Sequence, residues 1–231
     1  MTFALSDAEI ETLLLSLRVA GTATLVAVPL GVLTAWVLAR FRFPGRDLIS
    51  GIVHLPLVLP PVVTGYALLV LFGTHGPIGA LLKPFGIVFA FDWTGAALAA
   101  GVMGFPLLVR AARLSFEAVD PGLEQAAATL GASPGRRFFR VTLPLAAPGV
   151  VAGTVLAFAK ALGEFGATIT FVSNIPGLTR TLPLAIYTAT QTPEGDAAAM
   201  RLVIISVVIS IGAVLIAERV SRAVARRAAG L

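Results

Sequence analysis

Long stretches without a charged side chain decide what this sequence can fold into. The run from Val19 to Ala39 holds no charged residue and is bounded by Arg18 and Arg40. A helix needs roughly 20 mostly apolar residues to cross the hydrocarbon core of a bilayer. Because this run meets that length, we expect it to span a membrane.

Four further runs meet the same criterion. They are Leu48–Phe72, Trp93–Val109, about Pro148–Val172 and about Ala197–Ala217. The first of these four contains Pro56, Pro60 and Pro61, and it must bend because proline removes a backbone donor and clashes with the preceding turn. The expected fold is all-α: a polytopic membrane protein with five transmembrane helices in a single domain of residues 1–231.

The composition agrees with a bilayer as the solvent. Only 13% of the residues are charged, against about 25% in an average soluble protein. The absence of Cys excludes disulfides, thiol catalysis and Cys-ligated metals, and two His are too few for a His-rich metal site. We expect no catalytic residue, no metal and no cofactor, and we assign the net charge of +5 to topology rather than to nucleic-acid binding.

Two other apolar segments are too short or too interrupted to span. Residues 78–91 contain Lys83, Pro84 and Gly86, and residues 182–187 lie between polar flanks. We expect both to be loop or interfacial pieces on one side of the membrane. A re-entrant turn is the alternative for the second segment.

Arg and Lys are distributed unequally between the loops. Twelve of them fall in the loop after the first span, the loop after the third span and the C-terminal tail, and four fall on the other side. Because short cytoplasmic loops carry the excess of positive charge, we expect the N-terminus outside and the C-terminus inside the cell. The loop after the third span, which contains residues 120–145, is then cytoplasmic.

Residues 120–145 have the pattern of a helix, a turn and a second short helix. Asp120 suits an N-cap, Pro121 suits a first helical position, and Gly131 suits the positive φ that ends a helix. The second piece is expected over Arg136–Val141, with Leu143-Pro144 ending it at the membrane. The side chains exposed on this segment are expected to be few and short, a surface that fits a partner's groove. A loop that only connects two spans is the alternative.

The chain lacks a P-loop for ATP. That loop requires Gly-Lys-Ser/Thr, and neither Lys83 nor Lys160 follows a glycine. Any ATPase that drives this protein is therefore a separate polypeptide.

Two opposite charges lie within the fourth expected span. Lys160 and Glu164 are four residues apart and would share one face of a continuous helix. An unpaired charge at the bilayer centre costs roughly 2.5–3.5 kcal/mol on insertion scales. The pair either lines a transport path or gate, or fixes helix packing, and the residues leave both open. Thr64 and Tyr66, beside the prolines of the second span, are further candidates for the path.

The cytoplasmic segment resembles the signature of ABC importer permeases. That signature has Glu-Ala-Ala, three residues, Gly, nine residues, Ile or Val, one residue, and Leu-Pro. One departure is visible, because a glutamine stands at the acidic position and Glu124 precedes it. The residues that match at the same spacing are Gln125, Ala126, Ala127, Gly131, Val141, Leu143 and Pro144.

The resemblance implies a type I, MetI-like permease fold and several partners. These are a second permease copy, a dimer of ATP-binding subunits, an extracellular or periplasmic binding protein and the lipid of a bacterial inner membrane, with no nucleic acid. It implies that this chain is a transport subunit and not an enzyme. It also implies an ATPase-docking surface of Glu124, Gln125, Ala126, Ala127 and Gly131, joined to the fourth span by Val141, Leu143 and Pro144.

The substrate is indicated by resemblance alone. The stretches LPLVLPPVVTGY and LGEFGATITFVSNIPGLTRTLPLAIYTATQTP resemble molybdate permeases. Sulfate and thiosulfate permeases, and permeases for tungstate, which is the same kind of tetrahedral dianion, are alternatives. A function of another class is an ATP-independent anion channel or secondary transporter with Lys160 and Glu164 as a relay.

Overall fold

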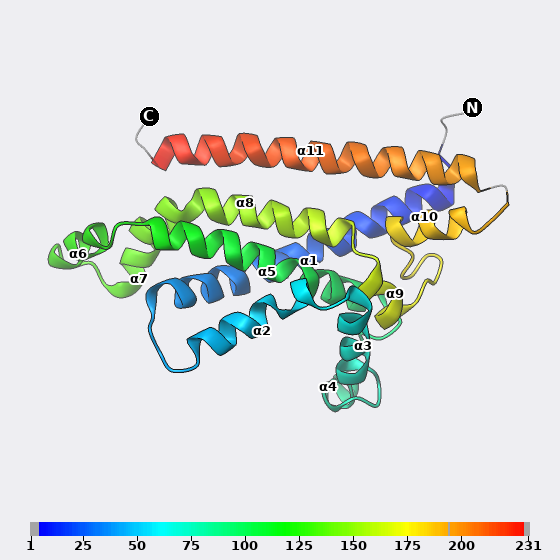
Figure 1. The fold of residues 1–231 in the computed structure, drawn as a ribbon, viewed down its shortest axis with the longest axis horizontal. Coiled ribbons are helices and arrows are strands. Elements are labelled where there is room, and N and C mark those ends of the chain that lie inside the picture. The colour runs from blue at the N-terminus through cyan, green and yellow to red at the C-terminus, as the bar shows by residue number, and fades with distance from the viewer. Residues whose placement is uncertain (1–4, 194, 229–231) are drawn as a thin grey trace.

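The computed structural model describes residues 5–193 and 195–228, and every regular element in these ranges is a helix. This confirms the all-α prediction. The long helices are α1 (Asp7–Arg40), α5 (Trp93–Ala118), α8 (Leu143–Leu162) and α11 (Asp196–Ala228) (Figure 1). The short helices are α2 (Arg46–Val58), α3 (Pro61–Phe72), α4 (Pro77–Leu82), α6 (Pro121–Thr129), α7 (Pro134–Arg137), α9 (Gly166–Val172) and α10 (Leu182–Thr190), with a 3₁₀ turn η1 (Lys83–Phe85) and a π-helical segment η2 (Phe138–Thr142).

Four stretches of the described chain are long and apolar enough to cross a membrane. Three are α1, α5 and most of α11, and the fourth is the continuous helical stretch Pro134–Leu162. The pair α2 and α3 adds a fifth crossing if it is counted as one span, although the two helices are bent by 116°. The bend falls at Pro60 and Pro61, as the sequence predicts, because Pro61 occupies the first turn of α3, where its missing N–H costs nothing.

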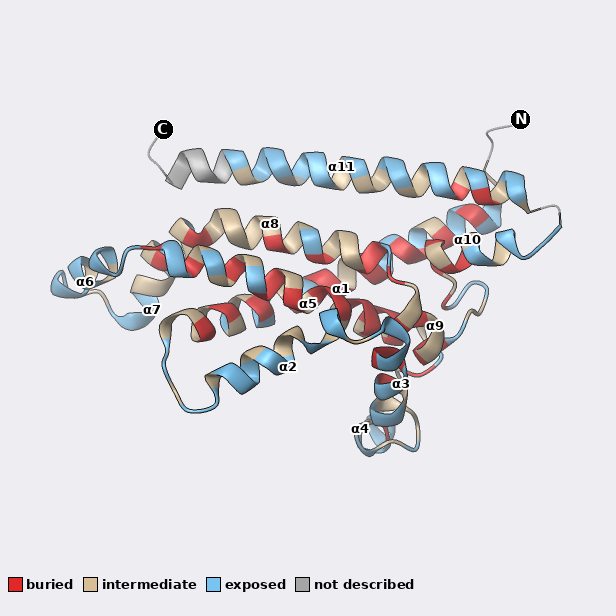
Figure 2. Ribbon diagram, in the orientation of Figure 1, coloured by how far each residue is buried: buried red, intermediate tan, exposed pale blue. Residues whose placement is uncertain are grey.

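Helix α5 lies at the centre of the bundle. It packs against both α1 and α8, and α11 lies along the outer side of α8 (Figure 1). Figure 2 shows the result as buried stripes on α5 and on the facing sides of α1 and α8, whereas α11 stays largely exposed. The exposed apolar side chains of α11 suit contact with lipid, and the buried face of α5 is made mostly of alanine and glycine.

Small residues bring α5 and α8 into backbone contact. Gly149, Gly153 and Ala157 recur at every fourth position on α8 and so form one stripe. A Cβ added to Gly153 would lie 2.9 Å from the carbonyl oxygen of Leu108, and one added to Gly149 would collide with the side chain of Ser115. The stripe therefore permits a packing distance that larger side chains would prevent.

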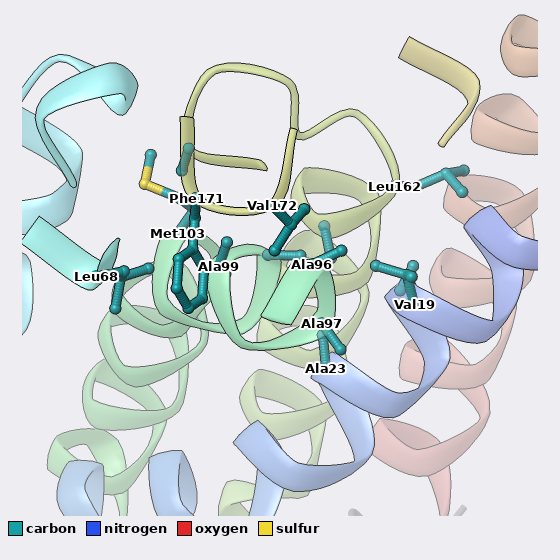
Figure 3. Packing of buried hydrophobic residues seen from close by; sticks show 14 of the residues in the cluster. Val19, Ala23, Leu68, Ala96, Ala97, Ala99, Met103, Leu162, Phe171 and Val172 are labelled. Carbon is teal, nitrogen blue, oxygen red and sulfur yellow. The ribbon is translucent and has the colours of Figure 1, made fainter. Parts of the chain in front are cut away.

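A cluster of buried side chains lies where α3, α5 and α9 meet. Figure 3 shows Phe171 and Val172 of α9 beside Met103 of α5 and Leu68 of α3. All four are at most 6% exposed. Helix α9 is therefore wedged between α3 and α5.

Of the two interpretations of residues 182–187, a loop or an interfacial piece, the loop is wrong. They begin helix α10, in which Leu182 and Leu184 are buried, and the Leu182 N–H donates to the Ser16 hydroxyl of α1 over 2.7 Å. Long-range packing against α1 and α11 stabilises a helix that is too short to be recognised from its own sequence. Residues 78–91 hold the short helix α4 and the turn η1.

Candidate functional site

The helix at the start of residues 120–145 forms as its sequence predicts. The Asp120 carboxylate accepts a hydrogen bond from the Gly122 N–H over 2.8 Å, and Pro121 is the first residue of α6. Gly131 has φ +82°, a value that residues with a Cβ rarely adopt, and it follows Leu130, the C-cap of the helix. Local capping chemistry therefore sets both ends of α6.

The expected helix end at Leu143-Pro144 is wrong. The chain continues without a break from α7 through the π-helical segment η2 into α8. Pro144 falls in the first turn of α8, and the wider turn of η2 directly precedes it. The second part of residues 120–145 and the following span are thus one continuous helical rod over Pro134–Leu162.

The acidic residue of the segment does not face outward. Glu124 Oε1 lies 3.1 Å from Arg40 Nη2 at the end of α1 and accepts a hydrogen bond from the Thr142 hydroxyl over 2.6 Å. Gln125, which stands at the signature's acidic position, is exposed. Glu124 therefore holds the segment to the bundle, and the residue left free for a partner is Gln125.

The expected docking face is more apolar than the sequence suggests. Gln125, Ala126 and Gly131 are exposed, and Ala127 is half-buried. The prediction of few and short exposed side chains is wrong, because the exposed fractions of three large apolar residues are 48% for Leu123, 88% for Leu130 and 68% for Phe139. Large apolar residues in a segment outside the expected spans were the sequence signal that could have found them.

The residues that join this face to the span are less accessible. Val141 and Leu143 are half-buried, and Pro144 is exposed. They follow Phe138, which packs against Trp36 of α1 and Phe116 of α5 with ring centroids 4.9 and 6.2 Å apart. The base of the segment is therefore anchored in the apolar core.

The predicted fourth span is broken before its expected end. Helix α8 ends at Leu162, Gly163 is its C-cap, and α9 begins at Gly166 as a separate helix. Lys160 Nζ does pair with Glu164 Oε2 over 2.6 Å, but Glu164 lies in the break and not on a helix face. Its Oε1 accepts the Ala167 N–H over 2.9 Å, so the carboxylate also satisfies a free donor at the start of α9.

The two members of this pair differ in exposure. The side chain of Glu164 is 1% exposed, and that of Lys160 is 31% exposed. The carboxylate is thus enclosed by protein, whereas the ammonium group reaches the surface of this chain. The glycines on both sides of a charged residue in an apolar run were the sequence signal for a break.

Helix α3 packs against α9 and against the break that precedes α9. A Cβ added to Gly65 of α3 would lie 2.5 Å from the carbonyl oxygen of Ala167, and one added to Gly166 would lie 2.7 Å from Pro61 Cβ. The residue after Gly65, Tyr66, is 62% exposed. Thr64 is buried within the packed region.

The four predicted path residues are only partly brought together. Hydrogen bonds among the described residues join Lys160 to Glu164 but join neither Thr64 nor Tyr66 to that pair. The packing of α3 against α9 nevertheless places both stretches in one region of the molecule.

Comparison with known proteins identifies the family. Residues 27–227 match the family described as "Binding-protein-dependent transport system inner membrane component". The chain belongs to this family. It is therefore a membrane transport subunit of a binding-protein-dependent system, as the signature in residues 125–144 predicted.

Two individual relatives are similar to this chain over most of its length. The "Molybdenum transport system permease protein ModB" of Escherichia coli K12 is 57% identical over 227 residues, which cover 98% of this chain and 99% of that protein. The "Probable sulfate transport system permease protein cysT" of Chlorokybus atmophyticus is 40% identical, over 77% of this chain and 62% of that protein.

The fold is that of solved ABC importers. A bacterial ABC transporter that imports the acidic polysaccharide alginate matches with a TM-score of 0.75 at 19% identity, over 94% of this chain and 80% of that chain. The inward-facing MetNI methionine ABC transporter matches with a TM-score of 0.69 at 17% identity, over 95% of this chain and 99% of that chain. At these identities the match supports the fold, and it confirms the expected type I permease architecture.

Proposed function

We propose that this chain is the membrane-spanning permease subunit of an ATP-driven molybdate importer in a bacterial inner membrane. The observation that carries the proposal is the 57% identity to the E. coli molybdenum permease over almost the whole of both chains. Residues 1–231 act as one permease domain, and residues 120–145 are its coupling segment to the ATPase.

Two copies of the chain form the path, two ATP-binding subunits dock from the cytoplasm, and a periplasmic or extracellular binding protein delivers the anion. The family description, which names binding-protein-dependent transport, supports the last partner. The N-terminus lies outside and the C-terminus lies in the cytoplasm. Figure 1 supports this arrangement, because α6 and α7 lie at the same end of the molecule as the C-terminal end of α11, where Arg219 and Arg222 also belong.

Docking on the ATP-binding subunits uses the exposed part of the segment. Gln125, Ala126, Ala127 and Gly131 form its polar and small-residue part, and Leu130 supplies the most exposed apolar side chain. Val141, Leu143 and Pro144 continue from this surface into α8. ATP binding and hydrolysis take place in the partner, and this chain carries out no covalent chemistry.

The path or gate lies where α3 and α9 meet. Lys160 and Glu164 mark it because a charged pair within a membrane protein usually faces a wet cavity or another subunit. The half-exposed ammonium group of Lys160 attracts the dianion, and the buried carboxylate of Glu164 prevents it from binding too tightly. Tyr66 faces the path from α3, and Thr64 supports the packing beside it.

Reconstitution tests this proposal. The chain is placed in proteoliposomes with its ATP-binding subunit and binding protein, and uptake of molybdate, tungstate and sulfate is measured with and without ATP. We expect ATP-dependent molybdate uptake that tungstate inhibits more strongly than sulfate. Preferred uptake of sulfate would favour the alternative that the 40% identity to the sulfate permease suggests. Gradient-driven flux through the chain alone would instead support a channel or secondary transporter.

A further inference from the structure

Four elements of the fold meet at one guanidinium group on the cytoplasmic side of the bundle. Arg40 ends α1, and its Nη2 donates to the carbonyl oxygen of Val119, which is the C-cap of α5, over 3.0 Å. The same Nη2 lies 3.1 Å from Glu124 Oε1 on α6. Thr142, at the end of η2, donates its hydroxyl proton to that same oxygen over 2.6 Å.

The contact among Arg40, Glu124 and Thr142 is more shielded from water than the neighbouring ion pair between Arg113 and Glu117. Thr142 is 2% exposed, and the side chains of Arg40 and Glu124 are 16% and 22% exposed. A partly buried pair is screened less by salt than a surface pair, and removing one member leaves the other charge unpaired. The pair Arg113–Glu117 offers a contrast, since its hydrogen bond lies within α5, the Glu117 side chain is 38% exposed, and the second cation near Glu117, Arg46 of α2, is 3.8 Å away.

The contact joins residues that are distant in sequence. Arg40 and Glu124 are separated by 84 positions. The pair therefore ties α6, which carries the proposed docking face, to the end of α1. Because Thr142 stands at the start of α8, its hydroxyl ties the same carboxylate to the span that leads to Lys160 and Glu164.

We propose that Arg40, Glu124 and Thr142 form a clamp that makes the docking helix α6 move as one body with α1, α5 and α8. Glu124 is then a positioning residue that transmits force, whereas Gln125 faces the ATP-binding subunit. This proposal rests on the proposed function, and it deepens that function by assigning the transmitting charge to the residue before the signature's acidic position.

The first test separates coupling from assembly. Glu124→Gln, Arg40→Gln and the double variant are reconstituted with the ATP-binding subunit and binding protein, with Glu117→Gln as the control. We expect each clamp variant to co-purify with the ATP-binding subunit but to hydrolyse about fivefold or more ATP per molybdate imported. The double variant should be no worse than the worse single variant, because both remove the same contact. Glu117→Gln should leave the ratio unchanged.

A milder variant covers the case in which loss of a charge prevents folding. Thr142→Val removes one hydrogen bond and keeps the ion pair, so the ratio should rise by a smaller factor. If Thr142→Val and every clamp variant that assembles keep the wild-type ratio, the clamp proposal is wrong.

A rescue experiment tests whether the contact between α1 and α6 stays closed throughout the transport cycle. The chain contains no Cys, so Arg40→Cys combined with Glu124→Cys places two unique thiols in α1 and α6. A short bifunctional thiol reagent that spans the replaced pair should restore coupled transport, because it rejoins the two helices. Arrest of transport by the cross-link would show that the helices separate during the cycle and would overturn the proposal.

The wild-type complex distinguishes failure of the clamp proposal from failure of the proposed function. If the wild-type complex imports no molybdate with ATP, the proposed function fails. If the wild-type complex imports molybdate and the clamp variants are equally well coupled, only the clamp fails.

Discussion

Glu124 and Glu164 are both acidic residues beside a cation, yet their surroundings differ. Glu124 pairs with Arg40, a residue 84 positions away, and accepts a hydrogen bond from a third element. Glu164 pairs with Lys160 only four positions away and accepts the N–H of Ala167 three positions on. One carboxylate joins distant parts of the fold, and the other organises a local break in the chain.

The difference shows how the same chemistry serves two purposes. A carboxylate that accepts hydrogen bonds from separate helices fixes their relative position, as at α1, α6 and η2. A carboxylate that accepts only from its own neighbourhood ends one helix and starts the next, as between α8 and α9. We therefore expect loss of Glu164 to affect stability most and loss of Glu124 to affect coupling most.

The largest stability effect is expected from Glu164→Ala. The substitution leaves the ammonium group of Lys160 and the N–H of Ala167 without their partner. Removing one member of a fully buried pair costs about 3–5 kcal/mol, and because Lys160 remains 31% exposed we expect a loss of about 2–4 kcal/mol in the free energy of unfolding. Equilibrium unfolding of the purified protein in mixed detergent micelles measures this loss.

Glu117→Ala is the control for that measurement. The Glu117 side chain is 38% exposed, against 1% for Glu164, and its two cations, Arg113 and Arg46, lie 2.8 and 3.8 Å away, so its ion pairs should contribute about 1 kcal/mol or less. Equal losses for the two variants would contradict the structural role assigned to Glu164.

Gly65→Ala tests the packing of α3 against the break. A Cβ at this position would lie 2.5 Å from the backbone oxygen of Ala167, and backbone atoms cannot move aside as a flexible side chain can. We expect a loss of about 1–3 kcal/mol in the free energy of unfolding. Gly51→Ala in α2 is the matched control, because no heavy atom lies within 4 Å of its added Cβ. That control should be neutral or stabilising by up to about 1 kcal/mol, and the reverse order would refute the packing argument.

Leu130→Asp tests the exposed end of the proposed coupling segment. Leu130 is 88% exposed, so its replacement should leave the free energy of unfolding unchanged. We expect the affinity for the ATP-binding subunit to fall about tenfold, as for an interface residue worth about 1.4 kcal/mol. Titration of labelled ATP-binding subunit onto the permease in detergent measures it. Leu81→Asp in α4, where Leu81 is 72% exposed, should leave the affinity unchanged, and equal losses would remove the case for docking at Leu130.

The smallest effect is expected from Gln125→Glu, which restores the signature's acidic residue. Gln125 is exposed, and Arg40 is already paired with Glu124. The free energy of unfolding should therefore change by no more than about 0.5 kcal/mol. A larger change in thermal or detergent unfolding would mean that the new carboxylate competes for Arg40, which would weaken the distinction drawn between positions 124 and 125.

Features that depend on neighbouring residues could be predicted from the sequence. Asp120, Pro121 and Gly131 set the ends of α6 through local capping, and the prolines at 60 and 61 set the bend before α3. The spacing of residues 125–144 led to the family. For the helix ends and the bend, the deciding interaction lies within a few positions of the residue that indicates it.

Features that depend on distant contacts could not be predicted. The sequence shows Arg40 and Glu124 as two isolated charges, and only the fold brings them to 3.1 Å. Helix α10 likewise forms because α1 and α11 cover it. The break after Leu162 could be predicted only in part. Gly163 and Gly166 indicate a break, but the spacing of Lys160 and Glu164 fits a continuous helix equally well.

The π-helical segment Phe138–Thr142 affects how the residues before it are oriented around the axis of α8. Successive residues of an α-helix are rotated by about 100° around its axis, and a π-helical turn accommodates one residue more than an α-helical turn. Deleting one residue here would therefore convert the wider turn into an α-helical turn and leave α6 and Leu130 in nearly the same orientation around α8. The same deletion in the α-helical part of the rod would turn them by about 100°, so this segment is the place where a change of one residue in length does not reorient the proposed docking face.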